Sequence, residues 1–378
     1  MDWRIPLFKI HWDENDVERV ASAIRRGMFW ATGPEVGEFE TRLCEYFGVK
    51  YAVTVNSGTS ALHAALLAHG IGPGDEVIVP SFTFIATANA PLFVGAKPVF
   101  AEIEDETFGL KPDDVVKRIT PRTRAIIPVH YGGCPCYCAE LAQIARKHGL
   151  ILIEDAAESF GAMVDGRKVG TFGGSAILSF CAPKIITTGE GGAVITDSKD
   201  LYERAKLICS HGRAETADYF SSTEPMDYVT LGYNFRMSTM TAALGLAQIE
   251  KVDEIISRRR ENANYLSEKL LGIKGIAIPD PPDQYFHTYQ MYTIRVNNKD
   301  TRDKLMLHLL QKKIMAKVYF QPVHLTQFYR REFGYREGDL PLTEKITAEV
   351  LTLPMYPTLT KEDMDYMAQQ IRDFFIHV

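Results

Sequence analysis

The feature that most constrains the fold of this chain is an alternation of short apolar runs with helical segments through its first half. The runs, among them 51–55, 76–80 and 151–155, are apolar along their length and do not alternate with polar residues. Such runs indicate strands buried on both faces, which is typical of a mostly parallel sheet covered by helices. The sequence therefore predicts an α/β fold whose functional side chains collect beyond the carboxyl ends of the strands.

The second part of the chain has a different pattern, in which strands and helices come in mixed runs that predict a smaller α+β domain. The predicted elements there are the helices 239–271, 301–311 and 361–375 and the strands 289–296, 316–320 and 350–353. At about 150 residues per domain, we expect a large domain at 1–250, which includes an N-terminal helical segment, and a small C-terminal domain at 251–378.

The bulk composition argues against several classes of partner. The chain has 42 Lys and Arg against 48 Asp and Glu, a net charge of −6, so it lacks the basic excess expected of a nucleic-acid-binding protein. No apolar run reaches the ~18 residues of a membrane span. The N-terminus has no signal-peptide pattern. We therefore expect a cytoplasmic protein.

The six cysteines do not form a disulfide framework in a chain of this length. Cys134, Cys136 and Cys138 alternate along one segment, so three thiols could meet a soft metal. No second group of ligands with CxxC or HxxxH spacing accompanies them. The pattern favours a loop of small residues, and no metal site is predicted.

Two strand ends in the first part of the chain could bind a phosphate and a ring. The strand 51–55 turns into an apolar helix at 57–60, and a helix N-terminus offers N–H groups and positive partial charge to a phosphate. An ordinary helix cap would explain the same residues. Phe84 follows the strand 76–80 and supplies an aromatic ring nearby.

Two further strand ends carry charged side chains. Asp155 ends an apolar strand, and a buried carboxylate needs a cationic or hydrogen-bonding partner. Lys184 follows the apolar run 176–180, where a strongly hydrated lysine must be neutralised, paired or used covalently. A buried lysine with a lowered pKa can attack a carbonyl. The alternative is a surface lysine in a loop beside a hairpin.

Together the four groups predict pyridoxal 5'-phosphate (PLP), which has a phosphate, a flat ring, a ring nitrogen and an aldehyde. Asp155 would keep the pyridine nitrogen protonated, since a nearby opposite charge favours the charged form. Lys184 would hold the aldehyde as a Schiff base and then move a proton.

Six stretches also match the motifs of a known family: SGTSALH at 57–63, GIGPGDEVIVPS at 70–81, IEDAAE at 153–158, SFCAPKIITTGEGG at 179–192, GYNFRM at 232–237 and LPMYP at 353–357. On these motifs the chain resembles the DegT/DnrJ/StrS family of PLP-dependent nucleotide-sugar aminotransferases almost from end to end. The resemblance implies the fold type I architecture, with a mixed, mostly parallel sheet in the large domain.

The resemblance implies a role for each matching residue. Lys184 becomes the Schiff-base lysine, Asp155 the partner of the pyridinium and Glu158 a contact on the ring hydroxyl side; these three are the expected catalytic residues. The other expected cofactor contacts within the chain are Gly58, Thr59, Phe84 and Ser179.

Three more residues are expected near a site shared between two subunits. The family is built as a homodimer in which Asn234 reaches the phosphate of the neighbouring cofactor. Arg236 is expected close to the shared site, with a structural salt bridge as the alternative. His324 is expected to reach the substrate from the small domain, with a hydrogen-bonded structural histidine as the alternative.

The resemblance also implies a reaction, in which an amino group moves from L-glutamate to a nucleotide-linked keto-sugar in cell-surface polysaccharide or glycan biosynthesis. The stretch 184–192 is similar to enzymes that aminate C4 of 4-keto-6-deoxy sugars, and perosamine synthases, which convert GDP-4-keto-6-deoxymannose to GDP-perosamine, look closest. Amination at C3 or of a cyclitol is the nearest alternative. A sugar dehydratase would carry histidine at position 184, and a non-catalytic regulatory protein would lack Lys184 or Asp155. The sequence departs from its relatives at 133–138 and 213–228, and these departures bear on the identity of the substrate and not on the PLP chemistry.

Overall fold

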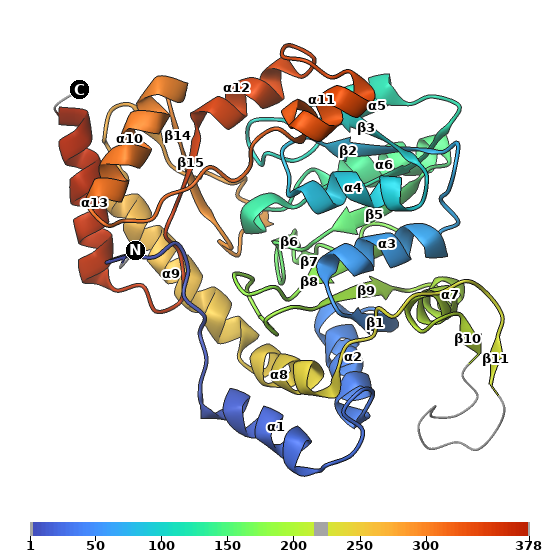
Figure 1. Ribbon diagram of the computed structural model, residues 1–378. Helices are drawn as coiled ribbons and strands as arrows, with labels where there is room; N and C mark the ends of the chain where they lie inside the picture. Colours follow the sequence, from blue (N-terminus) through green and yellow to red (C-terminus); the bar gives the residue numbers. More distant parts are fainter. Residues whose placement is uncertain (1–2, 215–225, 377–378) are drawn as a thin grey trace.

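A mixed sheet of seven strands forms the centre of the larger part of the molecule (Figure 1), within residues 3–214 and 226–376, which the computed structural model describes. Across the sheet the strands are β1 (Tyr51–Val55), β9 (Gly192–Thr196), β8 (Ser175–Ser179), β5 (Ile151–Asp155), β4 (Thr123–Ile126), β2 (Glu76–Pro80) and β3 (Lys97–Ala101). Strand β9 runs antiparallel to both of its neighbours, and the other adjacent pairs are parallel. The predicted α/β fold is confirmed.

Helices cover both faces of this sheet because alternate residues of each strand point to opposite sides. The covering helices are α2 (Pro34–Phe47), α3 (Gly58–Ala68), α4 (Ile85–Phe93), α5 (Pro112–Arg118), α6 (Cys138–His148), α7 (Lys199–Cys209) and α8 (Thr239–Glu250). Val77 and Val79 pack in the core that contains α3, α4 and α7. Ile78, between them, packs in the core that contains α5 and α6, together with Cys136 and Cys138.

The smaller part of the molecule is built on a second, antiparallel sheet. Its elements are β12 (Ile276–Ala277), β14 (Tyr292–Val296) and β15 (Val350–Leu353), with α9 (Val252–Leu270), α10 (Lys299–Gln311) and α13 (Lys361–Ile376) packed around them. Ile5, near the N-terminus, is fully buried in this second core. The predicted boundary at 250/251 coincides with the junction of α8 and α9. Ile5, however, belongs to the range 1–250 and packs in the core of the smaller part. The division into two domains stays a prediction.

Three predicted elements differ from the structure. The single helix 239–271 is interrupted at Lys251, whose ammonium lies 2.6 Å from the carboxylates of both Asp13 and Asp16. The strand 289–296 begins only at Tyr292, because Tyr289 has a positive φ of 49°. The segment 316–320 makes one isolated bridge to β15 and then leaves it.

The remaining described elements are short or lie at the periphery. They are α1 (Glu14–Arg25), α11 (Gln327–Phe333), α12 (Pro341–Glu349), the 3₁₀ turns η1 (Tyr131–Gly133) and η2 (Val323–Leu325), and the two-residue strands β6 (Met163–Val164), β7 (Arg167–Lys168), β10 (Arg213–Ala214), β11 (Asp227–Tyr228) and β13 (Tyr285–Phe286). Of the departure predicted at 213–228, residues 215–225 lie outside the described part. No helix of the described residues has the length and apolar character to cross a bilayer.

Candidate active site

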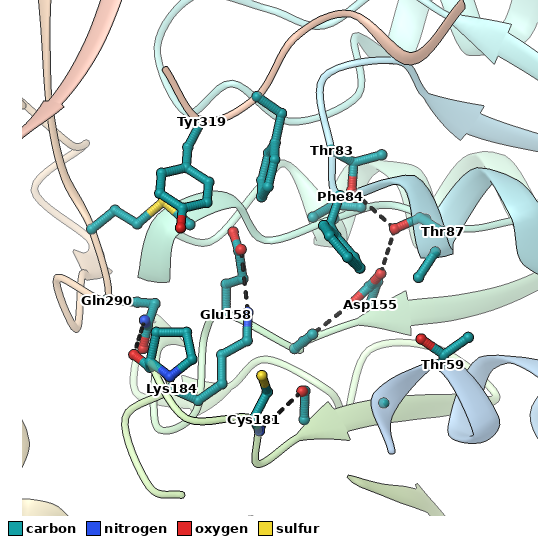
Figure 2. Close-up of a pocket in the computed structure, with 18 of the residues that line it drawn as sticks. Thr59, Thr83, Phe84, Thr87, Asp155, Glu158, Cys181, Lys184, Gln290 and Tyr319 are labelled. Atoms are coloured by element: carbon teal, nitrogen blue, oxygen red, sulfur yellow. Dashed lines mark hydrogen bonds and ion pairs between the residues drawn. The ribbon is translucent and has the colours of Figure 1, made fainter. Parts of the chain in front are cut away.

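A cavity of about 450 Å³ lies at the carboxyl ends of β5 and β8, between the large sheet and segments of the smaller part (Figure 2). Its lining contains seven of the ten residues predicted for the site: Gly58, Thr59, Phe84, Asp155, Glu158, Ser179 and Lys184. They come from four separate strand ends and the loops that follow them. The parallel sheet brings these ends to one edge, as the sequence predicts.

One end of the cavity is formed by the N-terminus of α3. Ser57 caps this helix, and its Oγ accepts the N–H of Ser60 at 3.1 Å. The first turn of a helix has N–H groups without partners inside the helix. A Cβ on Gly58 would lie 2.8 Å from the Cβ of Ser179, so only glycine allows this close approach. The result is a polar cradle suited to a phosphate.

Asp155 lies in the floor of the cavity and is 3% exposed. Its Oδ2 accepts a hydrogen bond from Thr87 Oγ1 at 2.8 Å, and its Oδ1 accepts the N–H of Ala157 at 3.1 Å. Burial raises the pKa of the Asp155 carboxyl, while these two hydrogen bonds oppose the shift. A cation placed against the carboxylate would reverse the effect of burial, as a protonated ring nitrogen does.

Lys184 faces Asp155 across the cavity and is paired with Glu158 (Figure 2). Its Nζ lies 3.3 Å from Glu158 Oε1, and both side chains are mostly buried. Glu158 Oε2 also accepts the N–H of Gly132 at 3.1 Å. A primary amine and two carboxylates thus meet in one half-enclosed cavity.

Aromatic side chains form one wall of the cavity. Phe84, which precedes α4, lies 6.1 Å from Phe320, measured between ring centroids. Tyr319 lines the cavity beside Phe320. Phe84 is 58% exposed in the single chain, so the cavity opens to the surface on this side. The phosphate cradle, the carboxylate, the amine and the aromatic wall together fit PLP.

Several residues that line the cavity were not predicted from the sequence, among them Thr87, Gln290 and Tyr319. Thr87 lies one turn into α4, and its position three residues after Phe84 is a signal that could have identified it. Gln290 and Tyr319 come from the smaller part of the chain, in segments predicted to be strands. No local pattern distinguishes these two residues.

Three predicted residues do not line this cavity. Asn234 and Arg236 lie beside β1, where Arg236 forms a β-bridge with Val55 and its guanidinium contacts Ser210. His324 is fully buried; its Nδ1 lies 2.7 Å from Ser81 Oγ and its Nε2 lies 3.2 Å from Glu344.

The placement of His324 agrees with the structural alternative given for it in the sequence analysis. Both ring nitrogens have protein partners, so the structural alternative describes this histidine. The pair Ser81 and His324 instead fastens the segment after Phe320 to the end of β2. Among the described residues no group of three or more His, Cys, Asp or Glu side chains is arranged to hold a metal ion.

Comparison with known proteins matches nearly the whole chain to one family of aminotransferases. The DegT/DnrJ/EryC1/StrS aminotransferase family model matches residues 11–372. GDP-perosamine synthase of Escherichia coli O157:H7 is 36% identical, covering 98% of each chain, and that of Caulobacter vibrioides is 37% identical, covering 96% of each. The pleiotropic regulatory protein of Geobacillus stearothermophilus is 36% identical over 96% of this chain and 95% of its own.

Solved structures extend the match to the fold. DesV of S. venezuelae, in complex with a ketimine intermediate, superposes with a TM-score of 0.91 at 34% identity over 100% of both chains. The PLP form of the putative sugar aminotransferase Spr1654 of Streptococcus pneumoniae superposes with a TM-score of 0.92 at 26% identity, covering 100% of this chain and 99% of that one. The chain therefore belongs to the DegT/DnrJ/EryC1/StrS family and is a PLP-dependent sugar aminotransferase.

Proposed function

We propose that this enzyme transfers the amino group of L-glutamate to C4 of a nucleotide-linked 4-keto-6-deoxy sugar, with GDP-4-keto-6-deoxymannose as the first candidate. The observation that carries the proposal is the similarity, at 36–37% identity and nearly full coverage, to GDP-perosamine synthases of two organisms. The stretch 184–192, similar to that of C4 enzymes, supports the same regiochemistry. The pathway would be synthesis of a cell-surface polysaccharide.

The residues of the cavity have separate tasks in this reaction. Bound PLP supplies a ring that withdraws electrons while the amino group is exchanged. Asp155 holds a proton on the ring nitrogen through charge pairing. The Nζ of Lys184 takes a proton from one carbon and returns it to another, which requires a position within hydrogen-bonding reach of both. Glu158, 3.3 Å away, keeps that amine oriented when no cofactor is attached.

The proposed enzyme is a homodimer with shared active sites. Large apolar side chains are exposed near the N-terminus and beside Asn234, including Trp12 at 59%, Trp30 at 49% and Leu231 at 80%. Association with a second subunit would bury such side chains. Asn234 does not line the cavity of its own chain, which is the arrangement required if it serves the partner's phosphate. The location of the enzyme would be cytoplasmic.

The test is to incubate the PLP-loaded protein and glutamate with keto-sugars carried on GDP, UDP and dTDP and to follow product mass. We expect one added amine on a 4-keto-6-deoxy sugar, with equimolar 2-oxoglutarate. Amination at C3, or of non-sugar ring ketones only, would overturn the proposed substrate. Loss of water without amine transfer, or no reaction with any sugar of the panel, would also overturn the proposed substrate.

A further inference from the structure

A hydrogen bond between the two parts of the chain lies directly beside the catalytic lysine. The side-chain amide of Gln290 donates from Nε2 to the carbonyl oxygen of Pro183 at 2.5 Å, and Gln290 lines the cavity with Lys184 (Figure 2). Gln290 precedes β14 in the smaller part, whereas Pro183 lies in the loop between β8 and β9. This bond therefore ties the peptide that carries Lys184 to the smaller part of the molecule.

The backbone at Gln290 is itself held by hydrogen bonds from a buried arginine. Arg259 of α9 is 2% exposed, and its guanidinium donates to the carbonyls of Tyr289, Gln290 and Met355 at 3.1, 3.4 and 3.0 Å. One buried cation thus binds three carbonyls around the base of the Gln290 side chain. Hydrogen bonds to a buried charge are strong, so they fix the backbone at Gln290. The side-chain amide of Gln290 therefore donates to Pro183 from a fixed position.

The same segment supports the counter-charge of Lys184. The N–H of Met291 donates to the carbonyl of Gly132 at 2.9 Å, and the N–H of Gly132 donates to Glu158 at 3.1 Å. Glu158 in turn lies 3.3 Å from Lys184 Nζ. The segment around Gln290 therefore reaches both the lysine-bearing peptide and the loop that holds the lysine's partner.

We propose that Gln290 is a positioning residue for Lys184, which holds the Pro183–Lys184 peptide so that Nζ meets the cofactor aldehyde in a reactive geometry. The amide is suited to this task because it is 6% exposed and contacts the peptide through its donor end. Its Oε1 is buried and has no hydrogen-bond partner within the described part of the chain. Stability alone does not explain an unpartnered buried acceptor, since such a group costs free energy. The inference rests on the aminotransferase chemistry and not on the identity of the sugar.

The first test measures lysine reactivity in cofactor-free protein. Gln290→Met keeps the length of the side chain and removes the donor, so we expect capture of PLP by Lys184, followed by visible absorbance, to slow about tenfold, the effect of one lost hydrogen bond. Acylation of Lys184 by acetic anhydride, followed by peptide mass, reads the same geometry without cofactor. Gln369→Met, at an exposed glutamine of α13, is the matched control and should react like the wild type.

The second test separates positioning from a merely structural role. In Gln290→Glu the ionised acid has no donor for Pro183, whereas the protonated acid has one. At each pH we compare the rate of PLP capture by the variant with the rate of the wild type. We expect this ratio to be low at neutral pH and to rise toward one as the pH falls. Wild-type rates in both variants would overturn the proposal, and so would an equal loss at every pH. Thermal melting confirms folding, and Gln290→Glu alone decides if Gln290→Met does not fold. Neither readout requires a sugar, so failure here leaves the proposed substrate untouched.

Discussion

Two adjacent carboxylates at the end of β5, Glu154 and Asp155, are almost equally buried and yet have opposite surroundings. Glu154 accepts the N–H groups of Gly170, Phe172 and Gly173 at 2.8, 2.6 and 2.8 Å and lies 3.1 Å from His130 Nε2. Asp155 accepts two hydrogen bonds and faces the cavity. Because successive residues of a strand point to opposite faces, one residue step separates an acid bound on all sides by protein donors from an acid that faces the cavity.

The difference shows that burial of a charge does not identify its role. A carboxylate offers about four acceptor positions. Protein donors occupy those of Glu154, and this anion fastens the loop after β7 to the sheet. Asp155 has capacity left on the side where a ligand cation would lie. The remaining acceptor capacity, more than the exposed fraction, distinguishes the two.

The largest effect is expected from replacing Lys184, which lines the same cavity as Asp155. Lys184→Ala should abolish the visible absorbance of lysine-bound PLP and lower transferase activity about 10³-fold or more, since both nucleophile and proton carrier are removed. Absorbance spectra and amine transfer from glutamate measure the two effects. Lys147→Ala, at an exposed lysine of α6, is the control. Turnover at the wild-type rate in Lys184→Ala would contradict the assigned site.

Asp155→Asn should lower transferase activity about 10²–10³-fold, the usual effect of losing one electrostatic partner of the reacting centre. The neutral amide keeps the shape of the side chain but no longer favours a protonated ring nitrogen. Steady-state kinetics with glutamate measure the loss, and the melting temperature verifies the fold. A variant as active as the wild type would mean that Asp155, like Glu154, is structural.

Glu154→Gln should act on stability, with a loss of about 1–3 kcal/mol in the free energy of unfolding. The amide presents N–H donors where Glu154 now accepts hydrogen bonds from backbone N–H groups and from His130. Urea unfolding measures the loss, and the absorbance of bound PLP in the folded fraction should be unchanged. The comparison fails if Glu154→Gln is fully stable but inactive.

Thr87→Val should lower the activity about tenfold, because one hydrogen bond to the Asp155 carboxylate is lost while the volume of the side chain is retained. Thr83→Val is the informative partner, since the hydroxyl of Thr83 contacts Thr87 at 2.9 Å and not the carboxylate. We expect a smaller loss in Thr83→Val. Equal losses would show that the threonines matter only for packing.

The smallest effect concerns the pH dependence of stability in cofactor-free protein. Burial raises the pKa of Asp155 above its ordinary value of 3.8. A raised pKa in the folded state favours the protonated form, so this contribution to stability is present at acid pH and is lost as the pH rises through the folded-state pKa. Asp155→Asn, which does not ionise, should gain stability relative to the wild type from about pH 4 upward. Parallel melting curves across that range would contradict the shift.

The predictions from the sequence succeeded where local chemistry decides the structure. Ser57 is the kind of residue that caps a helix, and the apolar run ending at Asp155 is the kind that forms a buried strand. Parallel strands then bring Gly58, Asp155 and Lys184 to one edge, so seven site residues could be predicted without coordinates. In the smaller part the predicted strand 350–353 and helix 361–375 are present. The predicted strand 289–296 was wrong at its start, where Tyr289 leaves the strand geometry and Gln290 enters the cavity.

The sequence by itself determined the class of fold and the cofactor, and it identified seven residues that line the cavity, because each depends on a residue type at the end of a recognisable element. Only the tertiary structure decided that His324 is enclosed between Ser81 and Glu344, that Glu154 is saturated while Asp155 is not, and that Gln290 meets Pro183. These facts depend on contacts between residues distant in the chain. Such contacts follow from the tertiary packing of the chain, which no local pattern encodes.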